Sequence, residues 1–206
     1  MNKKKLLSIG ILVFLVFVCL SYLIHKDFFT QFDFNTTVRI QDKISKRFDT
    51  FFSVFTLLGS AEVVTLFLIF VVILRKLKII SIFVSYFLGL VIELYGKIFV
   101  FHPGPPHMFF RYDIPFDFPS SYVKPGSSFP SGHSMRTAFI SVIILFLISR
   151  SKKLTPFNKK ILYSTIVLID IIMFISRVYL GEHWISDVIG GGLLGYSLGF
   201  LSLAFL

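Results

Sequence analysis

Six apolar runs of about 20 residues succeed one another along this chain of 206 residues, and they restrict its possible folds more than any other feature. A helix rises about 1.5 Å per residue, so one such run crosses the roughly 30 Å hydrocarbon core of a bilayer. The runs cover approximately residues 6–24, 52–74, 79–101, 134–149, 161–180 and 185–205. Hydrophobic residues make up 55% of the chain, above the range of about 45–50% that is typical of globular domains. We therefore predict an all-α integral membrane protein, a single domain over residues 1–206 built as a bundle of six transmembrane helices.

Basic residues in three connections predict the orientation of this bundle. The segments 2–5, 75–78 and 150–160 together hold eleven lysines and arginines and no acidic residue. Short loops rich in these residues stay on the cytoplasmic side. We therefore expect a multi-pass protein of the cytoplasmic membrane with both termini in the cytoplasm. The net charge of +10 then reflects topology, and we expect no nucleic-acid partner.

The remaining connections face the outer side in this topology. The segment 25–51 mixes charges of both signs with phenylalanines, which would suit a helix lying on the membrane interface. A solvated connector is the simpler interpretation, and it is the one we adopt. The segment 102–133 contains seven of the eight prolines, so we predict an irregular cap over the bundle.

Three polar clusters lie at this outer side, and the first is at the end of the run 79–101. Glu93 and Lys97 are one helical turn apart, which favours an ion pair. Considered alone, Lys97 is explained as well by a lysine that extends its charge toward the membrane surface.

The second cluster is the stretch SSFPSGHSMR, residues 127–136. Ser131, Gly132 and His133 lie where a loop enters the run 134–149. The start of a helix offers free backbone N–H groups and the positive end of the helix dipole, which suit an anion such as phosphate. Ser131 alone could equally be an ordinary N-cap.

The third cluster is the stretch SRVYLGEHWISD, residues 176–187. Asp187 follows His183 by one turn, so their side chains share a face. A carboxylate there can bind one imidazole nitrogen and leave the other free as a nucleophile or base. The forked guanidinium of Arg177 suits phosphate oxygens. The structural alternative is a salt bridge from Arg177 to Glu182 or Asp187.

Two further features lie inside the spans. Asp170 precedes Arg177 by two turns, and we predict that it anchors this arginine. Gly191, Gly195 and Gly199 form a ribbon of small residues, which predicts close helix packing.

Each cluster has a simple structural explanation by itself, but all of them reach the same membrane face. Together they contain cations, backbone donors, a nucleophile with an orienting carboxylate, and a second histidine. These are the components that phosphoryl transfer requires.

The motifs PSGH at 130–133 and SRVYLGEHWISD resemble the second and third signatures of the type 2 phosphatidic acid phosphatase (PAP2) superfamily. The third signature is Ser-Arg, five residues, His, three residues, Asp, and residues 176–187 match it without a gap. The resemblance covers roughly residues 97–187 by motif. It implies a six-helix core with the active site on the outer face.

The resemblance also implies a role for each matching residue. His183 would be the nucleophile that forms a phosphohistidine, Asp187 would orient it, and His133 would protonate the leaving oxygen. The phosphate would be held by Lys97, Ser131, Gly132 and Arg177. No metal and no other cofactor is implied.

The first family signature departs from its pattern. The family has Lys, six residues, then Arg-Pro, but the arginine position counted from Lys97 is Gly104. An expected phosphate-binding arginine is therefore missing. The candidates to replace it are His102, His107, Arg111, Lys124 and Arg136.

We therefore expect a metal-independent phosphatase that acts on a lipid phosphate or diphosphate at the outer leaflet. Undecaprenyl diphosphate is the first candidate substrate, followed by phosphatidylglycerol phosphate and phosphatidic acid. Three alternatives remain open: an intramembrane serine protease using Ser131 and His183, a metal hydrolase with His133, His183 and Asp187 as ligands, and a transporter or other binding protein. The sequence predicts no oligomeric state.

Overall fold

The computed structural model describes residues 2–75, 79–116 and 126–205, so Lys76, Lys78 and Lys124 lie outside the described residues. The described chain consists of α-helices, short 3-10 helices and loops, and the predicted all-α fold is confirmed. Five of its helices are long and apolar enough to cross a bilayer. They are α1 (Lys3–His25), α5 (Ile79–Phe99), α6 (Gly132–Arg150), α7 (Pro156–Tyr179) and α8 (Ile185–Ala204).

The second predicted span is not one continuous helix. The structure has α3 (Asp49–Thr56), the 3-10 helix η2 (Leu57–Gly59) and α4 (Ala61–Arg75) in its place, and the segments Lys46–Gly59 and Ala61–Val71 meet at 47°. Ser60 is extended and its hydroxyl accepts a hydrogen bond from the Val63 N–H at 3.3 Å, which starts α4 as an N-cap does. The carbonyl of Gly59 accepts from Arg136 Nε at 3.0 Å. The prediction missed this break because the apolar run continues through it.

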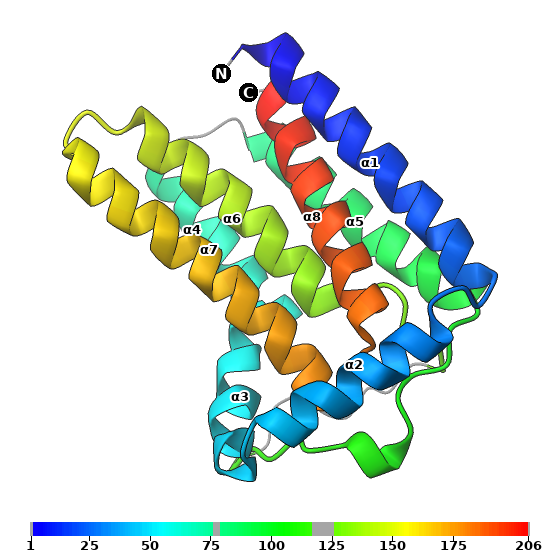
Figure 1. Cartoon of the computed structure of the whole chain (residues 1–206). Helices are drawn as coiled ribbons and strands as arrows, with labels where there is room; N and C mark the ends of the chain where they lie inside the picture. Colours follow the sequence, from blue (N-terminus) through cyan, green and yellow to red (C-terminus); the bar gives the residue numbers. More distant parts are fainter. Residues whose placement is uncertain (1, 76–78, 117–125, 206) are drawn as a thin grey trace.

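Helix α8 lies in the middle of the bundle, between α1, α5 and α6 (Figure 1). The predicted glycine ribbon is the reason that α6 and α8 approach so closely. A Cβ atom on Gly191 would lie 2.2 Å from the carbonyl oxygen of Ser131, and one on Gly195 would lie 2.1 Å from that of Met135. The prediction of close packing is confirmed. This contact also brings the N-terminal ends of α6 and α8 together.

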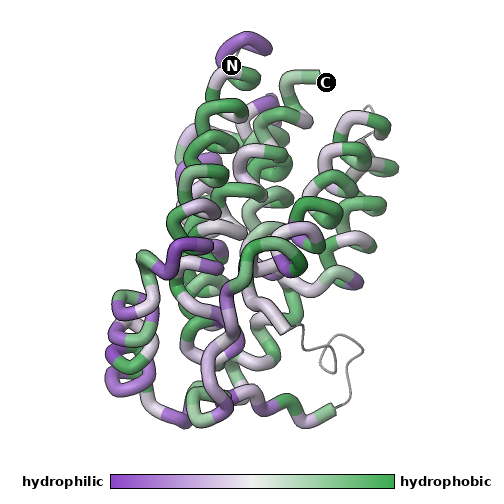
Figure 2. Tube along the Cα trace, turned by 90° about the vertical axis from the view of Figure 1, so that its right-hand side faces the viewer, coloured by the Kyte–Doolittle hydropathy of each residue, from purple (hydrophilic) through white to green (hydrophobic). Residues whose placement is uncertain are grey.

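The segment 25–51 is mostly helical, so the expected solvated connector is wrong. Helix α2 (Thr30–Lys43) lies across the end of the bundle opposite both termini (Figure 1), where hydrophilic positions gather (Figure 2). Its buried face carries Asp33, Thr37 and Gln41. Gln41 Nε2 donates to the carbonyls of Phe109 and Tyr179, at 2.6 and 2.8 Å. A polar stripe with helical spacing packs here because the helix ends and loops beneath it expose backbone groups that need partners.

The described parts of 102–133 run across this same end and include the 3-10 helix η3 (His107–Phe109). Pro103 and Ser127 form an isolated antiparallel bridge, and the N–H of Ser128 donates to the carbonyl of His102 at 2.9 Å. These contacts draw the two ends of the segment together over the helix ends. The predicted irregular cap is therefore present in the residues that the structure describes.

Candidate active site

Four helix ends meet at the end of the bundle that lies opposite the termini (Figure 1). They are the C-terminal ends of α5 and α7 and the N-terminal ends of α6 and α8. His133, at the start of α6, lies close enough to Lys97, Arg177 and His183 to interact with them electrostatically. The helices therefore bring one or more residues of each predicted cluster into one site.

Helix α6 begins with Ser131 as its N-cap residue. Within the described chain, the Ser131 side chain makes no capping hydrogen bond to the helix backbone, and its hydroxyl accepts instead from Ser134 Oγ at 3.1 Å. The Ser131 N–H donates to the carbonyl of Asp187 at 3.0 Å. The beginning of α6 is thus tied to the first turn of α8, which carries the predicted orienting carboxylate.

The carboxylate of Glu93 lies directly against Gly132. A Cβ atom on Gly132 would lie 2.0 Å from Glu93 Oε1, so a larger residue at this position would displace the Glu93 carboxylate. Glu93 also forms two ion pairs, one to Lys97 at 2.8 Å, as predicted, and one to Arg136 at 2.9 Å. Because breaking a buried pair leaves an uncompensated charge, Glu93 holds both cations firmly beside the start of α6.

Arg177 is only 3% exposed and reaches toward the same region from the end of α7. Its guanidinium donates to Thr56 Oγ1 at 2.7 Å and forms an ion pair with Glu182. The structural alternative of a salt bridge to Glu182 is therefore present. Its Nε, however, is buried and has no hydrogen-bond partner among the described residues. Buried donors are normally satisfied, so this N–H remains available to a bound anion.

Asp170 does not anchor Arg177, and that prediction is wrong. Its carboxylate accepts hydrogen bonds from Ser141 on α6 and Tyr196 on α8, at 2.7 and 2.8 Å. Asp170 and Arg177 are two turns apart on α7, and this spacing suggested that they meet. The helices α6 and α8, however, pack against α7 so that two hydroxyl groups lie within hydrogen-bond distance of the Asp170 carboxylate. Asp170 therefore joins three helices below the site.

His183 and Asp187 lie near each other as predicted, although His183 lies in the loop before α8 and only Asp187 is on the helix. Asp187 is fully buried, and its Oδ2 accepts the N–H of Trp184 at 2.9 Å. The same oxygen is 3.6 Å from His183 Nδ1, slightly longer than a hydrogen bond. His183 Nδ1 is buried and has no hydrogen-bond partner among the described residues. Catalytic contacts of this kind are often long before substrate binds.

The environment of His183 favours its neutral form. Its side chain lies in the loop between α7 and α8 and is 8% exposed. Burial, together with the positive charges of Arg177 and Lys97, lowers the pKa of His183, and the nearby Asp187 offsets this effect only in part. A neutral imidazole at neutral pH has a free electron pair with which to attack phosphorus.

The candidates for the missing arginine differ in how near they lie. Lys124 is outside the described residues. His107 is exposed on η3, and the guanidinium of Arg111 donates to a carbonyl oxygen of α2 at 3.2 Å. His102 reaches the site but binds a carboxylate there. Arg136 supplies an additional positive charge that acts on His133, which makes it the strongest of the described candidates.

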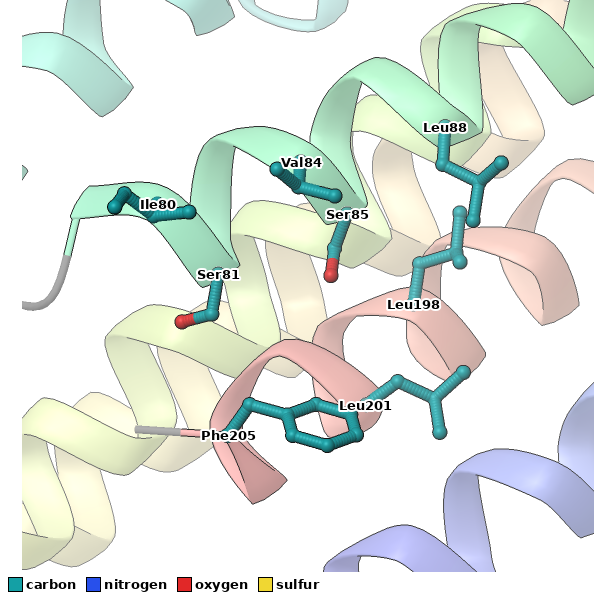
Figure 3. Close-up of a pocket in the computed structure, with 8 residues that line it drawn as sticks. All are labelled: Ile80, Ser81, Val84, Ser85, Leu88, Leu198, Leu201 and Phe205. Carbon is teal, nitrogen blue, oxygen red and sulfur yellow. The ribbon is translucent and has the colours of Figure 1, made fainter.

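A separate cavity of about 600 Å³ lies between α5 and α8 (Figure 3). Most of its lining is apolar, with Val84, Leu88 and Leu198 among the lining residues and hydroxyl groups only from Ser81 and Ser85. It lies toward the N-terminal end of α5, away from Glu93 and Lys97. The lining residues of this cavity carry no charge with which to bind phosphate, so the polar cluster is the candidate active site.

Comparison with known proteins defines the class. Residues 77–206 match the family model of the PAP2 superfamily, and this region includes the four helix ends and all seven residues predicted for the site. The chain belongs to the PAP2 superfamily, a class of membrane phosphatases.

Individual relatives are also similar to the chain. Phosphatidylglycerophosphatase B of Bacillus subtilis (strain 168) is 41% identical over 78 residues, which are 38% of this chain and 38% of that protein. The crystal structure of a PAP2-type phosphatidylglycerolphosphate phosphatase from Bacillus subtilis superposes with a TM-score of 0.73 at 24% identity, covering 95% of this chain and 94% of that one. LpxE of Aquifex aeolicus has a TM-score of 0.63 at 25% identity, covering 82% of this chain and 93% of that one. The fold is thus shared over nearly the whole chain.

Sequence reasoning misses three carboxylate contacts of this site: Glu93 with Arg136, Asp187 with His102, and Asp33 with Ser186. A signal for the first was available, because Arg136 is one of the few charged residues within the apolar runs and such residues need a buried partner. No local pattern points to the other two.

Proposed function

We propose that this chain hydrolyses a lipid phosphate or diphosphate at the outer membrane surface. The observation that carries the proposal is the meeting of His183, Asp187 and His133 with the cations of Lys97 and Arg177 at one end of the bundle. Family membership supports the same activity. The site lies at the end of the helix bundle, a place where a headgroup would bind while its apolar tail stays in the bilayer.

The residues would divide the reaction between them. The free nitrogen of His183 attacks the terminal phosphorus, and the bond from this phosphorus to its leaving oxygen breaks as His133 donates a proton to that oxygen. The leaving oxygen belongs to the lipid alcohol in a monophosphate and to the inner phosphate in a diphosphate. Water then cleaves the phosphohistidine and releases inorganic phosphate. Lys97, Arg177 and the backbone N–H groups at Ser131 and Gly132 would hold the phosphoryl oxygens, as cations and helix N-termini do in other phosphoryl-transfer sites.

Arg136 would take over the charge of the arginine that is missing at Gly104. It lies one turn after His133 and shares Glu93 with Lys97, so a phosphate arriving at Lys97 meets two cations rather than one. No metal or other cofactor takes part in these steps.

Three lipids are candidates for the substrate of this site. Two of the matches, both from Bacillus subtilis, carry phosphatidylglycerol phosphate phosphatase activity in their names, which favours phosphatidylglycerol phosphate. Undecaprenyl diphosphate, the first candidate from sequence, carries its terminal phosphate on a second phosphate, and phosphatidic acid carries it on an alcohol oxygen; both remain to be compared with phosphatidylglycerol phosphate.

Phosphate release by the purified chain in detergent, with a chelator present, tests the proposal. The three lipids are offered in parallel, and His183→Ala serves as the blank. We expect release from one or more lipids and none from His183→Ala, which retains the fold. Turnover by His183→Ala near the wild-type rate contradicts the nucleophile assignment, and loss of turnover in chelator favours the metal-hydrolase alternative. Release from none of the three lipids contradicts the proposal.

A further inference from the structure

The carboxylate of Asp187 is shared between two histidines, and the shorter contact is to the one outside the family motif. His102 Nδ1 is 2.7 Å from Asp187 Oδ1, whereas His183 Nδ1 is 3.6 Å from Oδ2. An ionised carboxylate only accepts hydrogen bonds, so Nδ1 of His102 carries a proton and donates it. Oδ1 of Asp187 therefore accepts a hydrogen bond from His102, and Oδ2 accepts one from the N–H of Trp184. One lone pair of Oδ2 remains to accept a hydrogen bond from His183.

His102 is itself held in place by the chain around it. It is 5% exposed, and its carbonyl accepts from the N–H of Ser128 at 2.9 Å and from Ser128 Oγ at 3.1 Å. The N–H of His102 donates to Ser127 Oγ at 3.3 Å. These contacts fix the backbone of His102, and burial together with the hydrogen bond from Nδ1 holds its imidazole against Asp187.

A second carboxylate faces the other nitrogen of the same imidazole. Asp33 Oδ2 of α2 is 3.6 Å from His102 Nε2, and Asp33 is 1% exposed. Asp33 is anchored to the start of α8, where its two oxygens accept from Ser186 N at 2.9 Å and from Ser186 Oγ at 2.6 Å. The helix that lies across the end of the bundle is thereby connected to the first turn of α8, next to Asp187.

We infer that His102 is a positioning residue for the proposed nucleophile, acting through Asp187, and that Asp33 supports it from α2. This inference rests on the proposed function for its catalytic consequence. With Asp187 held by His102, the imidazole of His183 moves a short distance to close its contact, and its other nitrogen then faces the phosphate.

The same geometry couples the charge of His102 to His183. Burial disfavours the imidazolium form of His102, but the hydrogen bond to Asp187 and the charges of Asp187, Asp33 and Asp27 outweigh it and raise the pKa of His102. An imidazolium at His102 offsets the charge of Asp187. Asp187, Arg177 and Lys97 act on His183, and Glu93 and His133 also interact with it. Removing the His102 charge strengthens the effect of Asp187, so the pKa of His183 should rise.

Two substitutions separate these effects. His102→Asn places an amide N–H near the position of Nδ1 and keeps a donor for Asp187 without a charge, whereas His102→Phe removes the donor. We expect His102→Phe to lower kcat by about 10- to 100-fold, the range for losing a hydrogen bond to a charged group, with little change in KM. His102→Asn should recover most of this rate, and the acid limb of its pH–rate profile should move to higher pH. The matched controls are His107→Asn and His107→Phe, in the exposed η3 of the same segment.

Histidine NMR gives a second readout that needs no turnover. The chain has five histidines, so ¹⁵N-histidine labelling in detergent, with assignment by substitution, follows the titration of His183 directly. Its midpoint should rise in His102→Asn and stay unchanged in His107→Asn. If the wild-type protein hydrolyses no lipid, the proposed function is wrong. The His183 titration in His102→Asn still tests whether His102 acts on His183 through Asp187. If His102→Phe does not fold, the titration in His102→Asn decides it as well.

Two results would overturn the inference. One is a His102→Phe enzyme with the kcat and pH profile of His107→Phe. The other is an unmoved His183 midpoint in His102→Asn. Asp33→Asn provides an additional check, because it removes the charge beside His102 Nε2 and should lower the titration midpoint of His102 if the two side chains interact as the structure shows.

Discussion

Substitution of Gly195 by alanine tests whether contact between α6 and α8 assembles the active site. The new Cβ would lie 2.1 Å from the carbonyl oxygen of Met135 and 2.9 Å from the Cβ of Ala138, whereas ordinary contact begins at 3.4 Å. The backbone contact is short by about 1.3 Å. A carbonyl inside a helix cannot turn away, so the two helices must separate. Overpacking of this kind costs about 1–3 kcal/mol of stability.

Separation of α6 and α8 should also lower the rate of phosphate release. Gly195 lies two turns after Asp187 on α8, and Met135 lies half a turn after His133 on α6. Displacing these helices by about 1 Å moves His133 relative to His183. Because misplacement of reacting groups by about 1 Å costs roughly 100-fold in rate, we expect Gly195→Ala to lose about 100-fold in phosphate release as well as stability.

Both effects can be measured on one preparation. Trp184 is the single tryptophan, and its Nε1 donates to the carbonyl of Pro103 at 2.7 Å, so its fluorescence follows the opening of the site during denaturation. Phosphate release from the lipid that the wild-type protein prefers gives the rate. Gly126→Ala is the matched control, because a Cβ at Gly126 meets no atom of the described residues within 4 Å. The reasoning is refuted if Gly195→Ala unfolds and turns over like Gly126→Ala.

Three further predictions concern the charges of the site. Glu93→Gln leaves Lys97 and Arg136 without their shared carboxylate, so denaturation followed by tryptophan fluorescence should show a loss of about 3–5 kcal/mol; a loss below 1 kcal/mol would show that the pairs contribute little. Because the pKa of His183 is lowered, its neutral form persists on mild acidification, and kcat/KM should begin to fall only below about pH 6.5, the ordinary histidine value. A fall that begins above pH 7 would argue against His183 as the group that must be neutral. Gly104→Arg restores the missing family cation at a position where a Cβ meets only Ser128, at 3.6 Å, and should strengthen vanadate inhibition; unchanged or weaker inhibition would show that Arg136 already replaces it or that the loop points elsewhere.

Much of the fold follows from local properties of the sequence. The long apolar runs define five of the spans to within a few residues, because crossing a bilayer depends mainly on length and hydropathy. The pair Glu93–Lys97 was equally predictable, since residues four apart on a helix share a face. The neighbouring positions of His183 and Asp187 were predicted on the same ground, but His183 lies in the loop before α8, so this loop, and not a helix face, sets their contact. The glycine ribbon on α8 predicted a close helix contact, because residues spaced by four lie on one face of a helix.

Other features depend on groups far apart in the chain. The apolar run continues through the bend between α3 and α4, so hydropathy gives no sign of it. At the break, the carbonyl of Gly59 accepts a hydrogen bond from Arg136 of α6. Helix α2 buries polar residues rather than apolar ones, so hydropathy could not place it. Asp170 shares a helix with Arg177, yet the hydroxyls of neighbouring helices take its carboxylate.

The sequence by itself determined that the chain spans a membrane, which motifs it carries and which residues share a helix face. Only the tertiary structure decided the partners of the buried carboxylates. His102 and Asp187 are 85 residues apart, and Asp33 and Ser186 are 153 residues apart. No periodicity links such positions, because the rotation and tilt of packed helices determine which side chains meet. A buried carboxylate must then bind whichever donors that packing brings within reach.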